Sequence, residues 1–438
     1  MTAKNEHSRH CARFTASEQW QRRAARSIPL GTQTFSKSFQ QFPQGYSPLF
    51  LDRGKGGRVW DLDGNRFVDL ICGLLPVVLG YKDTDVDQAI LEQLDKGITF
   101  SLASKLEAQL AERLVDLIPC AEMVRFGKNG TDATSGAIRL ARAHTSKNHV
   151  LAVGYHGWQD WYIGATTRNL GVPDEIQRLT RKVPYNDLSA IATAFREVDD
   201  DVAAVIMEPM NTDEPHDGYL EELASFVKKH GTLLIFDEVI TGFRYSNGGA
   251  QELFGVTPDL ACFGKALGNG MPISALVGRT DIMQLMSQVF YSSTFGGETL
   301  SLAAAIAVVD KFKSEPVVDR LWSTGELMTS HAEKAINEFD LEDSIQLLGK
   351  PPWKIFAVKD HSHGSKEAIK TLLLKGMIES GVLTGGAQNI CYAHNNEDIK
   401  TVATAYHNTM GLISEALSRP GLDERLDCPP VMPVFAVR

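Results

Sequence analysis

Short, wholly apolar runs alternate with amphipathic stretches through the middle of this chain, and this pattern constrains the fold more than any other feature. The runs 202–207 (VAAVIM) and 233–236 (LLIF) contain no polar residue. The stretch 132–143 (DATSGAIRLARA) instead gathers its apolar side chains largely on one helical face. Strands that are apolar on both sides are typical of a parallel sheet with helices on both faces. We therefore expect an α/β fold with a mixed, mostly parallel sheet.

The chain divides into three regions that differ in their sequence pattern. Residues 1–70 have a polar, helix-like start and then a hairpin around the turn at 63–65, which predicts the N-terminal segment of a small domain. Residues 71–320 carry the alternating pattern and predict the large domain. Residues 321–438 mix helical stretches with short strands such as 354–358, which indicates the C-terminal part of a small α+β domain.

Composition excludes several kinds of partner. Lys plus Arg is 44 against 54 for Asp plus Glu, and the resulting net charge of -10 would repel nucleic acids and anionic membranes. The most apolar stretch, 71–81, is far shorter than the roughly 20 residues of a membrane helix. The polar N-terminus lacks the apolar core of a secretory signal, so we expect a cytoplasmic protein. The six cysteines include no CxxC pair, which favours reduced thiols over disulfides or a metal site.

Acidic residues follow the two clearest strands. Glu208 comes directly after the first, and Asp237 and Glu238 come after the second. The ligand site of an open α/β sheet lies beyond the carboxyl ends of its strands, so these side chains are candidates for function. For Glu208 and Glu238 alone, a helix cap or an ion pair explains the acid as well as a functional role does.

One lysine stands between an apolar run and a glycine-rich turn. Lys265 follows 260–263 and precedes 268–270, and a lysine at a sheet end can lose its proton and attack a carbonyl group. Taken alone, a surface lysine is the better interpretation. Together with Asp237 on a neighbouring strand end, however, it provides what a pyridinium cofactor needs. Asp237 would keep the ring nitrogen protonated, while Lys265 would form the Schiff base and later move the substrate proton.

Two further segments fit this interpretation. Gly130 and Thr131 stand at the start of the expected helix, where free N–H groups and a hydroxyl can bind an anion. Simple capping of the helix by Thr131 is the alternative. Tyr155 follows the apolar run 150–153 and offers a flat ring for a pyridine face, although aromatic residues are more often part of a core.

Together these segments resemble the class III aminotransferases of pyridoxal-phosphate (PLP) fold type I, the aspartate aminotransferase-like fold. The most similar branch contains glutamate-1-semialdehyde 2,1-aminomutase. The resemblance covers about residues 29–400 and rests on six motifs in the family's order: NGTDATSGAIRLARAHT, GYHGWQDW, VIMEP, FDEVITGFR, FGKALGNGMPISALVGR and SSTFGGETLSLAAA.

The resemblance implies that the chain binds pyridoxal 5′-phosphate and no metal, through residues that match these motifs: Gly130, Thr131, Tyr155, Glu208, Asp237, Lys265 and Thr294. In this scheme Lys265 is the Schiff-base lysine, Asp237 binds the ring nitrogen, and Tyr155 stacks on the ring. Thr294 is similar to the threonine that family members contribute to the phosphate site of the neighbouring subunit. A homodimer with shared active sites is therefore implied.

The departures from the aminomutase pattern fall where substrate specificity is set. Lys37 lies near the place of an arginine that binds the substrate carboxylate, and lysine cannot make the same bidentate contact. Segment 386–394 (GAQNICYAH) loses an acidic residue and gains amides such as Asn389, which suit hydroxyl-rich substrates.

In this respect the chain is more similar to the amino-sugar branch of the family. The resemblance then implies an aminotransferase that moves an amino group from an amino acid, expected to be glutamate, to a keto-sugar or related carbonyl compound. One such acceptor is 8-keto-3-deoxy-octulosonate, in surface polysaccharide biosynthesis. Arg244 or Lys37 would hold the donor carboxylate. The alternative that stays open is intramolecular amino transfer of the aminomutase type.

Overall fold

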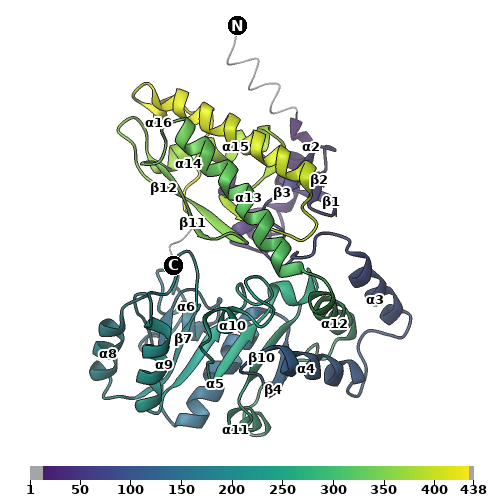
Figure 1. The fold of residues 1–438 in the computed structure, drawn as a ribbon, viewed down its shortest axis with the longest axis vertical. Helices are drawn as coiled ribbons and strands as arrows, with labels where there is room; N and C mark the ends of the chain where they lie inside the picture. Colours follow the sequence, from purple (N-terminus) through teal and green to yellow (C-terminus); the bar gives the residue numbers. More distant parts are fainter. Residues whose placement is uncertain (1–12, 434–438) are drawn as a thin grey trace. The chain divides into compact units, whose positions relative to one another are not determined.

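The computed structural model describes residues 13–433, which form two compact units (Figure 1). The large unit contains Leu75–Val77 and Asp83–Val318. The small unit contains the described residues up to Leu74, the segment Val78–Lys82, and the described residues from Asp319 onward.

The large unit is built on a seven-stranded sheet with the order β4-β10-β9-β8-β7-β5-β6. Strands β5 to β9 pair in parallel, whereas β10 runs antiparallel to both β4 and β9, so the sheet is mixed and mostly parallel as expected. The strands are β4 (Met123–Gly127), β5 (His149–Val153), β6 (Thr180–Lys182), β7 (Val202–Met207), β8 (Leu233–Asp237), β9 (Leu260–Phe263) and β10 (Ser274–Gly278). The two apolar runs of the sequence are β7 and β8, and every residue of both is buried.

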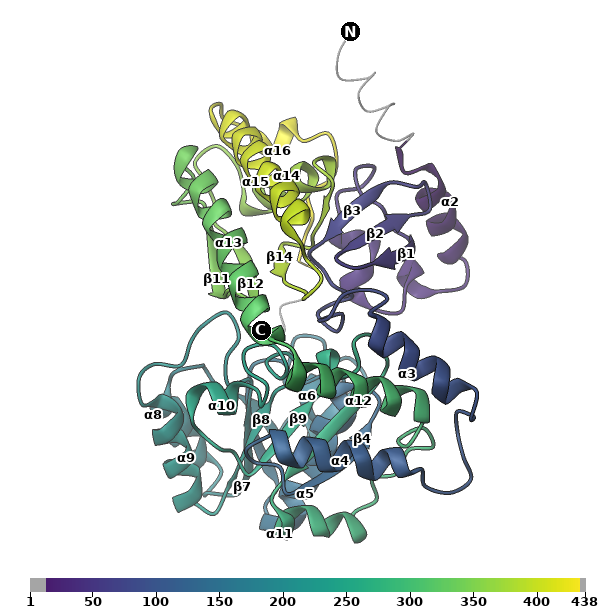
Figure 2. The ribbon, with the colours of Figure 1, turned by 45° about the vertical axis from the view of Figure 1, so that its right-hand side comes forward.

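Helices cover this sheet and complete its core. The apolar face of α5 (Gly130–Thr145) packs on alternate residues of the central strands, which is the period expected for a strand with two buried faces. Helices α3 (Thr84–Leu94) and α4 (Lys105–Leu117) pack against α12 (Thr299–Ser314), as Figures 1 and 2 show. The remaining helical segments are α6 (Asp160–Ile163), α7 (Asp174–Gln177), α8 (Leu188–Glu197), α9 (Tyr219–Lys229), α10 (Ala250–Phe254), η4 (Lys265–Gly268), α11 (Thr280–Met283) and η5 (Gln284–Ser287).

The small unit joins both ends of the chain. Its four-stranded sheet has the order β1-β2-β3-β13, in which β3 (Arg66–Asp69) pairs in parallel with β13 (Val382–Leu383). The predicted hairpin forms between β2 (Arg58–Asp61) and β3. A second, three-stranded sheet consists of β11 (Ile345–Lys350), β12 (Trp353–Val358) and β14 (Ala387–Asn389). The other elements are α2 (Thr15–Ala24), η1 (Pro29–Gly31), η2 (Phe35–Lys37), η3 (Phe39–Gln41), β1 (Leu51–Lys55), α13 (Val317–Glu338), α14 (Lys366–Glu379), α15 (Asn396–Leu417) and α16 (Leu422–Arg425).

These units agree with the expected α/β fold and with a small α+β part drawn from both termini. Within residues 13–433, no helix is both long enough and apolar enough to cross a membrane.

Candidate active site

A cavity of about 350 Å³ lies at the carboxyl ends of the parallel strands of the large unit. Its lining includes Tyr155 after β5, Glu208 after β7, Asp237 at the end of β8 and Lys265 after β9. Parallel strands end at the same edge of a sheet, so side chains that are distant in sequence meet there. Gly130 and Thr131, at the start of α5, line the same cavity.

Asp237 is held rigidly at the end of β8. One carboxylate oxygen, Oδ1, accepts a hydrogen bond from the Val239 N–H at 3.1 Å. The other, Oδ2, lies 2.8 Å from Nδ1 of His156. The Asp237 side chain is 6 % exposed and that of His156 is completely buried. A carboxylate fixed in such a dry position interacts strongly with any positive charge brought to it.

Lys265 occupies a strained backbone position. Its φ angle is 40°, in the left-handed region that residues with a Cβ rarely adopt. The residue begins η4 directly after β9 and Gly264, and its side chain reaches the cavity. Strain of this kind persists where the surrounding structure enforces it, and it is concentrated at functional sites.

The N-terminus of α5 provides donors for an anion. The first N–H groups of a helix have no partner within the helix, and they add to the positive end of its dipole. The Oδ2 atom of Asp132 accepts hydrogen bonds from the N–H groups of Lys128 and Asn129, at 2.9 and 2.8 Å. The Oγ1 atom of Thr131 is buried and has no hydrogen-bond partner among the described residues. A buried hydroxyl without a partner costs about 1–3 kcal/mol, so a bound acceptor would relieve this cost.

Tyr155 and Glu208 are connected through the backbone. The Tyr155 N–H donates to Oε2 of Glu208 at 3.1 Å, and Glu208 is 3 % exposed. The preceding Gly154 has a φ angle of 102°, and a Cβ there would lie 2.4 Å from Oε2 of Glu208. Glycine is therefore required at this turn. The Tyr155 ring meets Tyr162 edge to face, with 5.7 Å between the ring centroids. Glu208 thus positions the loop that carries Tyr155.

The structure does not bring every candidate residue to this cavity. Arg244 is completely buried, donates to the Leu75 carbonyl at 2.8 Å, and is absent from the cavity lining. Thr294 is exposed and is also absent from the lining. Lys37, which is exposed, and Asn389, which is buried, belong to the small unit.

The third strand-end acid, Glu238, has a structural role in α10. Its carboxylate accepts hydrogen bonds from the N–H groups of Ala250 and Gln251, at 2.7 and 2.9 Å, at the start of that helix. The sequence left a helix cap, an ion pair and a functional role open for Glu238, and these hydrogen bonds support the helix cap.

Two cavity residues were missed in the sequence. His156 follows Tyr155 directly, and its Nε2 atom is buried without a hydrogen-bond partner among the described residues. Val239 follows Asp237 by two positions, and its Cγ1 atom would lie 2.9 Å from a Cβ at Gly130. The sequence signal for both residues was their position next to a motif residue, Tyr155 for His156 and Asp237 for Val239. A histidine or valine at such a place is too common in cores to be distinguished by sequence.

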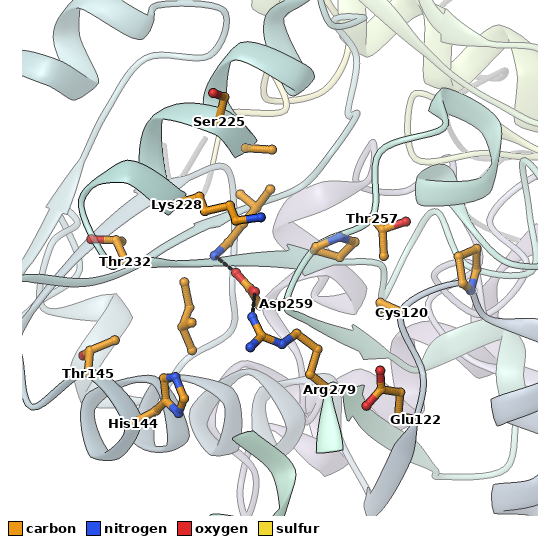
Figure 3. Close-up of a pocket in the computed structure, with 16 residues that line it drawn as sticks. Cys120, Glu122, His144, Thr145, Ser225, Lys228, Thr232, Thr257, Asp259 and Arg279 are labelled. Atoms are coloured by element: carbon orange, nitrogen blue, oxygen red, sulfur yellow. Dashed lines mark hydrogen bonds and ion pairs between the residues drawn. The ribbon is translucent and has the colours of Figure 1, made fainter. Parts of the chain in front are cut away.

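A second and larger cavity, of about 750 Å³, lies elsewhere in the large unit (Figure 3). It includes residues that precede β8 and β9, at the opposite edge of the sheet. Arg279, its most prominent cation, is paired with Asp259 at 2.6 Å and Asp281 at 2.7 Å. The charge of Arg279 is therefore already neutralised by these two carboxylates, and the cavity contains none of the motif residues. We assign the chemistry to the smaller cavity for this reason.

Comparisons with known proteins find similar proteins over most of the chain. The profile of the family described as aminotransferase class-III matches residues 41–396. A 3-aminobutyryl-CoA aminotransferase of Cloacimonas acidaminovorans is 34 % identical over 404 residues, which are 90 % of this chain and 96 % of that protein. A glutamate-1-semialdehyde 2,1-aminomutase of Desulforamulus reducens is 35 % identical over 422 residues, 90 % of this chain and 97 % of that protein. Among solved structures, the FumI protein of Sphingopyxis sp. MTA144, in its PLP internal aldimine form, has a TM-score of 0.87 at 26 % identity, with 95 % of this chain and 100 % of that chain covered.

Proposed function

The chain belongs to the class III aminotransferase family, and from this premise we propose that it is a pyridoxal-phosphate enzyme that moves an amino group from an amino acid to a carbonyl acceptor. One observation carries the proposal: Lys265, Asp237, Tyr155 and the start of α5 all line one cavity. In this proposal Lys265 would hold the reactive aldehyde of the cofactor, Asp237 its charged ring nitrogen, Tyr155 its flat ring and the start of α5 its phosphate.

The cavity residues fit this cofactor. Gly130 and Thr131 would bind its phosphate, because they supply helix N–H groups and a buried hydroxyl that needs a partner. Asp237 would hold the protonated ring nitrogen, and Tyr155 would lie on the ring. Glu208 would keep Tyr155 in place through the 3.1 Å hydrogen bond to its N–H group.

When bound, the cofactor supplies an electron sink for the charge that develops on the carbon bearing the amino group. Lys265 would hold the cofactor covalently through Nζ until the amino group of the donor displaces it. The released Nζ would then take the proton from that carbon and deliver it elsewhere on the substrate framework. His156 would keep the Asp237 carboxylate correctly oriented throughout, through the contact at 2.8 Å.

For the acceptor, we propose a keto-sugar or related carbonyl compound, such as 8-keto-3-deoxy-octulosonate, with glutamate as donor. Support comes from Lys37, where a carboxylate-binding arginine is replaced, and from the amide-rich segment around Asn389. In the small unit, Nδ2 of Asn389 donates to the Ile71 carbonyl at 2.8 Å, while its Oδ1 atom is buried without a partner among the described residues. That oxygen is the part of Asn389 still able to accept a hydrogen bond. Arg244 is the weaker candidate for the donor carboxylate, because it is buried outside the cavity lining.

A second candidate function is the aminomutase reaction. Relatives named glutamate-1-semialdehyde 2,1-aminomutase match about 90 % of this chain at 34–35 % identity, which is as close as the relative named as an aminotransferase. This reaction would use the same cavity but would need no separate amino donor.

Isotope transfer distinguishes the two candidates. We expect the purified enzyme to move nitrogen-15 from labelled glutamate to a keto-sugar, with formation of one 2-oxoglutarate per product, because the two half-reactions share one site. Mass spectrometry of the products measures this, and the Lys265→Ala protein is the matched control. Absence of label in every keto-sugar would contradict the proposed acceptor class. Conversion of glutamate-1-semialdehyde without any donor would favour the aminomutase instead.

We also propose that the enzyme is a homodimer. Exposed apolar side chains of the large unit support this, since single apolar residues are common on surfaces but large aromatic ones at this exposure are not. The most exposed are Leu170 (101 %), Leu102 (86 %), Phe290 (80 %), Trp158 (67 %) and Phe295 (57 %). Thr294 lies directly beside Phe295, so an interface there would bring it to a second subunit. We expect sedimentation equilibrium to give twice the chain mass, and Phe290→Asp to shift the protein toward the monomer. A monomeric wild-type protein would contradict the dimer and the role of Thr294.

A further inference from the structure

Two thiols and an imidazole lie together in the small unit, although their residues are far apart in the sequence. Cys72 follows β3, whereas Cys391 and His394 follow β14. One ligand-type atom from each of the three lies within 4.8 Å of the others. Cys72 and Cys391 are both 1 % exposed and His394 is 0 % exposed. The proposed amino transfer uses none of these three side chains.

The cluster is held in place by its surroundings. The Cys72 thiol contacts the carbonyl oxygens of Asp69 at 3.3 Å and Asn389 at 3.4 Å. The backbone of Cys72 has a φ angle of 48°, which is unfavourable for a residue with a side chain. The His394 ring is confined by Gly57, where an added Cβ would lie 2.4 Å from Cδ2. Cys72 is therefore kept beside Cys391 at a cost in backbone strain.

The hydrogen bonds of His394 argue against a metal ion in this cluster. Nδ1 accepts the Cys391 N–H at 3.1 Å, and Nε2 lies 3.2 Å from the Asp69 carbonyl. Because a carbonyl can only accept, Nε2 carries the ring hydrogen and donates to it. A metal ligand needs a free lone pair on a ring nitrogen, and here both nitrogens are already used. Two thiols would remain, which is fewer ligands than a closed structural site requires.

The two sulfur atoms are suited to bond with each other. The hydrogen bond from the Cys72 thiol, with a smaller contribution from the neighbouring His394 ring, holds the pKa of the Cys391 thiol well below its ordinary value. A thiolate is the reactive form of cysteine. Cys391 is therefore the attacking residue and Cys72 is the resolving one. Their separation of at most 4.8 Å requires only local adjustment to reach a disulfide.

We propose that Cys72 and Cys391 form a reversible disulfide when hydrogen peroxide oxidises them. The Cys391 thiolate attacks one peroxide oxygen, the O–O bond breaks, and the departing hydroxide takes a proton and leaves as water. Cys72 then loses its proton and attacks the oxidised sulfur, the S–O bond breaks, and a second water leaves. Two thiols are oxidised and one hydroperoxide is reduced. Hydrogen peroxide is close to water in size, so it can reach sulfur atoms that larger disulfide reagents cannot.

This bond would connect the end of β3 to the segment after β14. The two segments already touch, because the Asn389 N–H donates to the Leu70 carbonyl at 3.1 Å and its side chain donates to the Ile71 carbonyl. The disulfide would add a covalent link beside these hydrogen bonds and fix the surroundings of Asn389. The small unit would then respond to peroxide independently of any chemistry in the large unit.

Peptide mapping tests the proposal. The full-length protein is treated with hydrogen peroxide, unfolded in N-ethylmaleimide to block the remaining thiols, and digested without reduction. We expect a linked peptide pair containing Cys72 and Cys391 that disappears after treatment with dithiothreitol. In Cys72→Ser, no link can form, and Cys391 should instead carry added oxygen. Cys428→Ser is the matched control, because Cys428 is another buried cysteine of the same unit, and it should leave the link unchanged.

Two results would overturn the inference. One is that Cys72 and Cys391 of the wild-type protein are both recovered as maleimide adducts, as Cys428 is, after the peroxide treatment. The other is a stoichiometric metal ion in the purified protein that Cys391→Ser lacks, which would assign the cluster to metal binding. The wild-type map decides the matter even if a serine variant fails to fold.

Discussion

Replacement of Lys265 by alanine is expected to lower kcat by at least about 10³-fold, because the variant loses both its covalent attachment to the cofactor and its proton carrier. Lys265 lines the cavity at the carboxyl edge of the sheet, directly after β9 and next to a glycine-rich turn. Alanine has no amine that could replace either role. The measurements are the transamination rate with glutamate and, after borohydride reduction, the position of the pyridoxyl group in a peptide map.

The control for this prediction is another lysine of the large unit. Lys228 is exposed at the end of α9 and lines the second cavity (Figure 3), so Lys228→Ala should keep wild-type kcat. The fold should survive in both variants, since the Lys265 side chain is not part of a hydrophobic core cluster. A pyridoxyl group attached to some other lysine in the wild-type protein, or an unaltered rate in Lys265→Ala, would refute the assignment.

Replacement of Asp237 by asparagine is expected to lower kcat by about 10²–10³-fold, as is typical when a preorganised electrostatic group is removed from a dry site. Asparagine keeps the size of the side chain and can still contact His156, but it removes the negative charge that would hold the ring nitrogen protonated. The expected result is loss of the proton-transfer rate with little loss of bound cofactor. Stopped-flow absorbance of the bound cofactor measures the first quantity, and its content after gel filtration measures the second.

His156 provides a graded comparison for Asp237. His156→Gln removes the ring that contacts Asp237 at 2.8 Å but leaves the carboxylate in place, so a smaller loss is expected than for Asp237→Asn. Equal activity of Asp237→Asn and the wild-type protein would contradict the proposed role of the carboxylate.

Much of the fold and the outline of the site could be predicted because they depend on local patterns. The runs that became β7 and β8 are apolar throughout, and this property is visible without any tertiary information. Once these strands are parallel, their carboxyl ends must share an edge, which brings Glu208 and Asp237 to the same region. The start of α5 was visible for a similar reason, since glycine and threonine before an apolar helical face mark a helix N-terminus.

What the sequence could not provide depends on contacts between distant residues. The contact of His156 with Asp237 follows from the packing of the turn after β5 against the end of β8. The position of Arg244 could not be predicted because its guanidinium binds a backbone carbonyl, a partner that sequence patterns do not mark. The proximity of Cys72 to Cys391 has the same origin, since the segments after β3 and β14 come together through contacts such as the hydrogen bond from the Asn389 N–H to the Leu70 carbonyl.

The pairing of β3 with β13 also sets an order of events during synthesis. A ribosome releases residues 66–69 long before residues 382–383 exist, so this sheet must wait for most of the chain while its first strands stay exposed. The strands of the large unit all appear between these two moments, and that unit can fold first. The nascent small unit is therefore the part of this protein most dependent on chaperones.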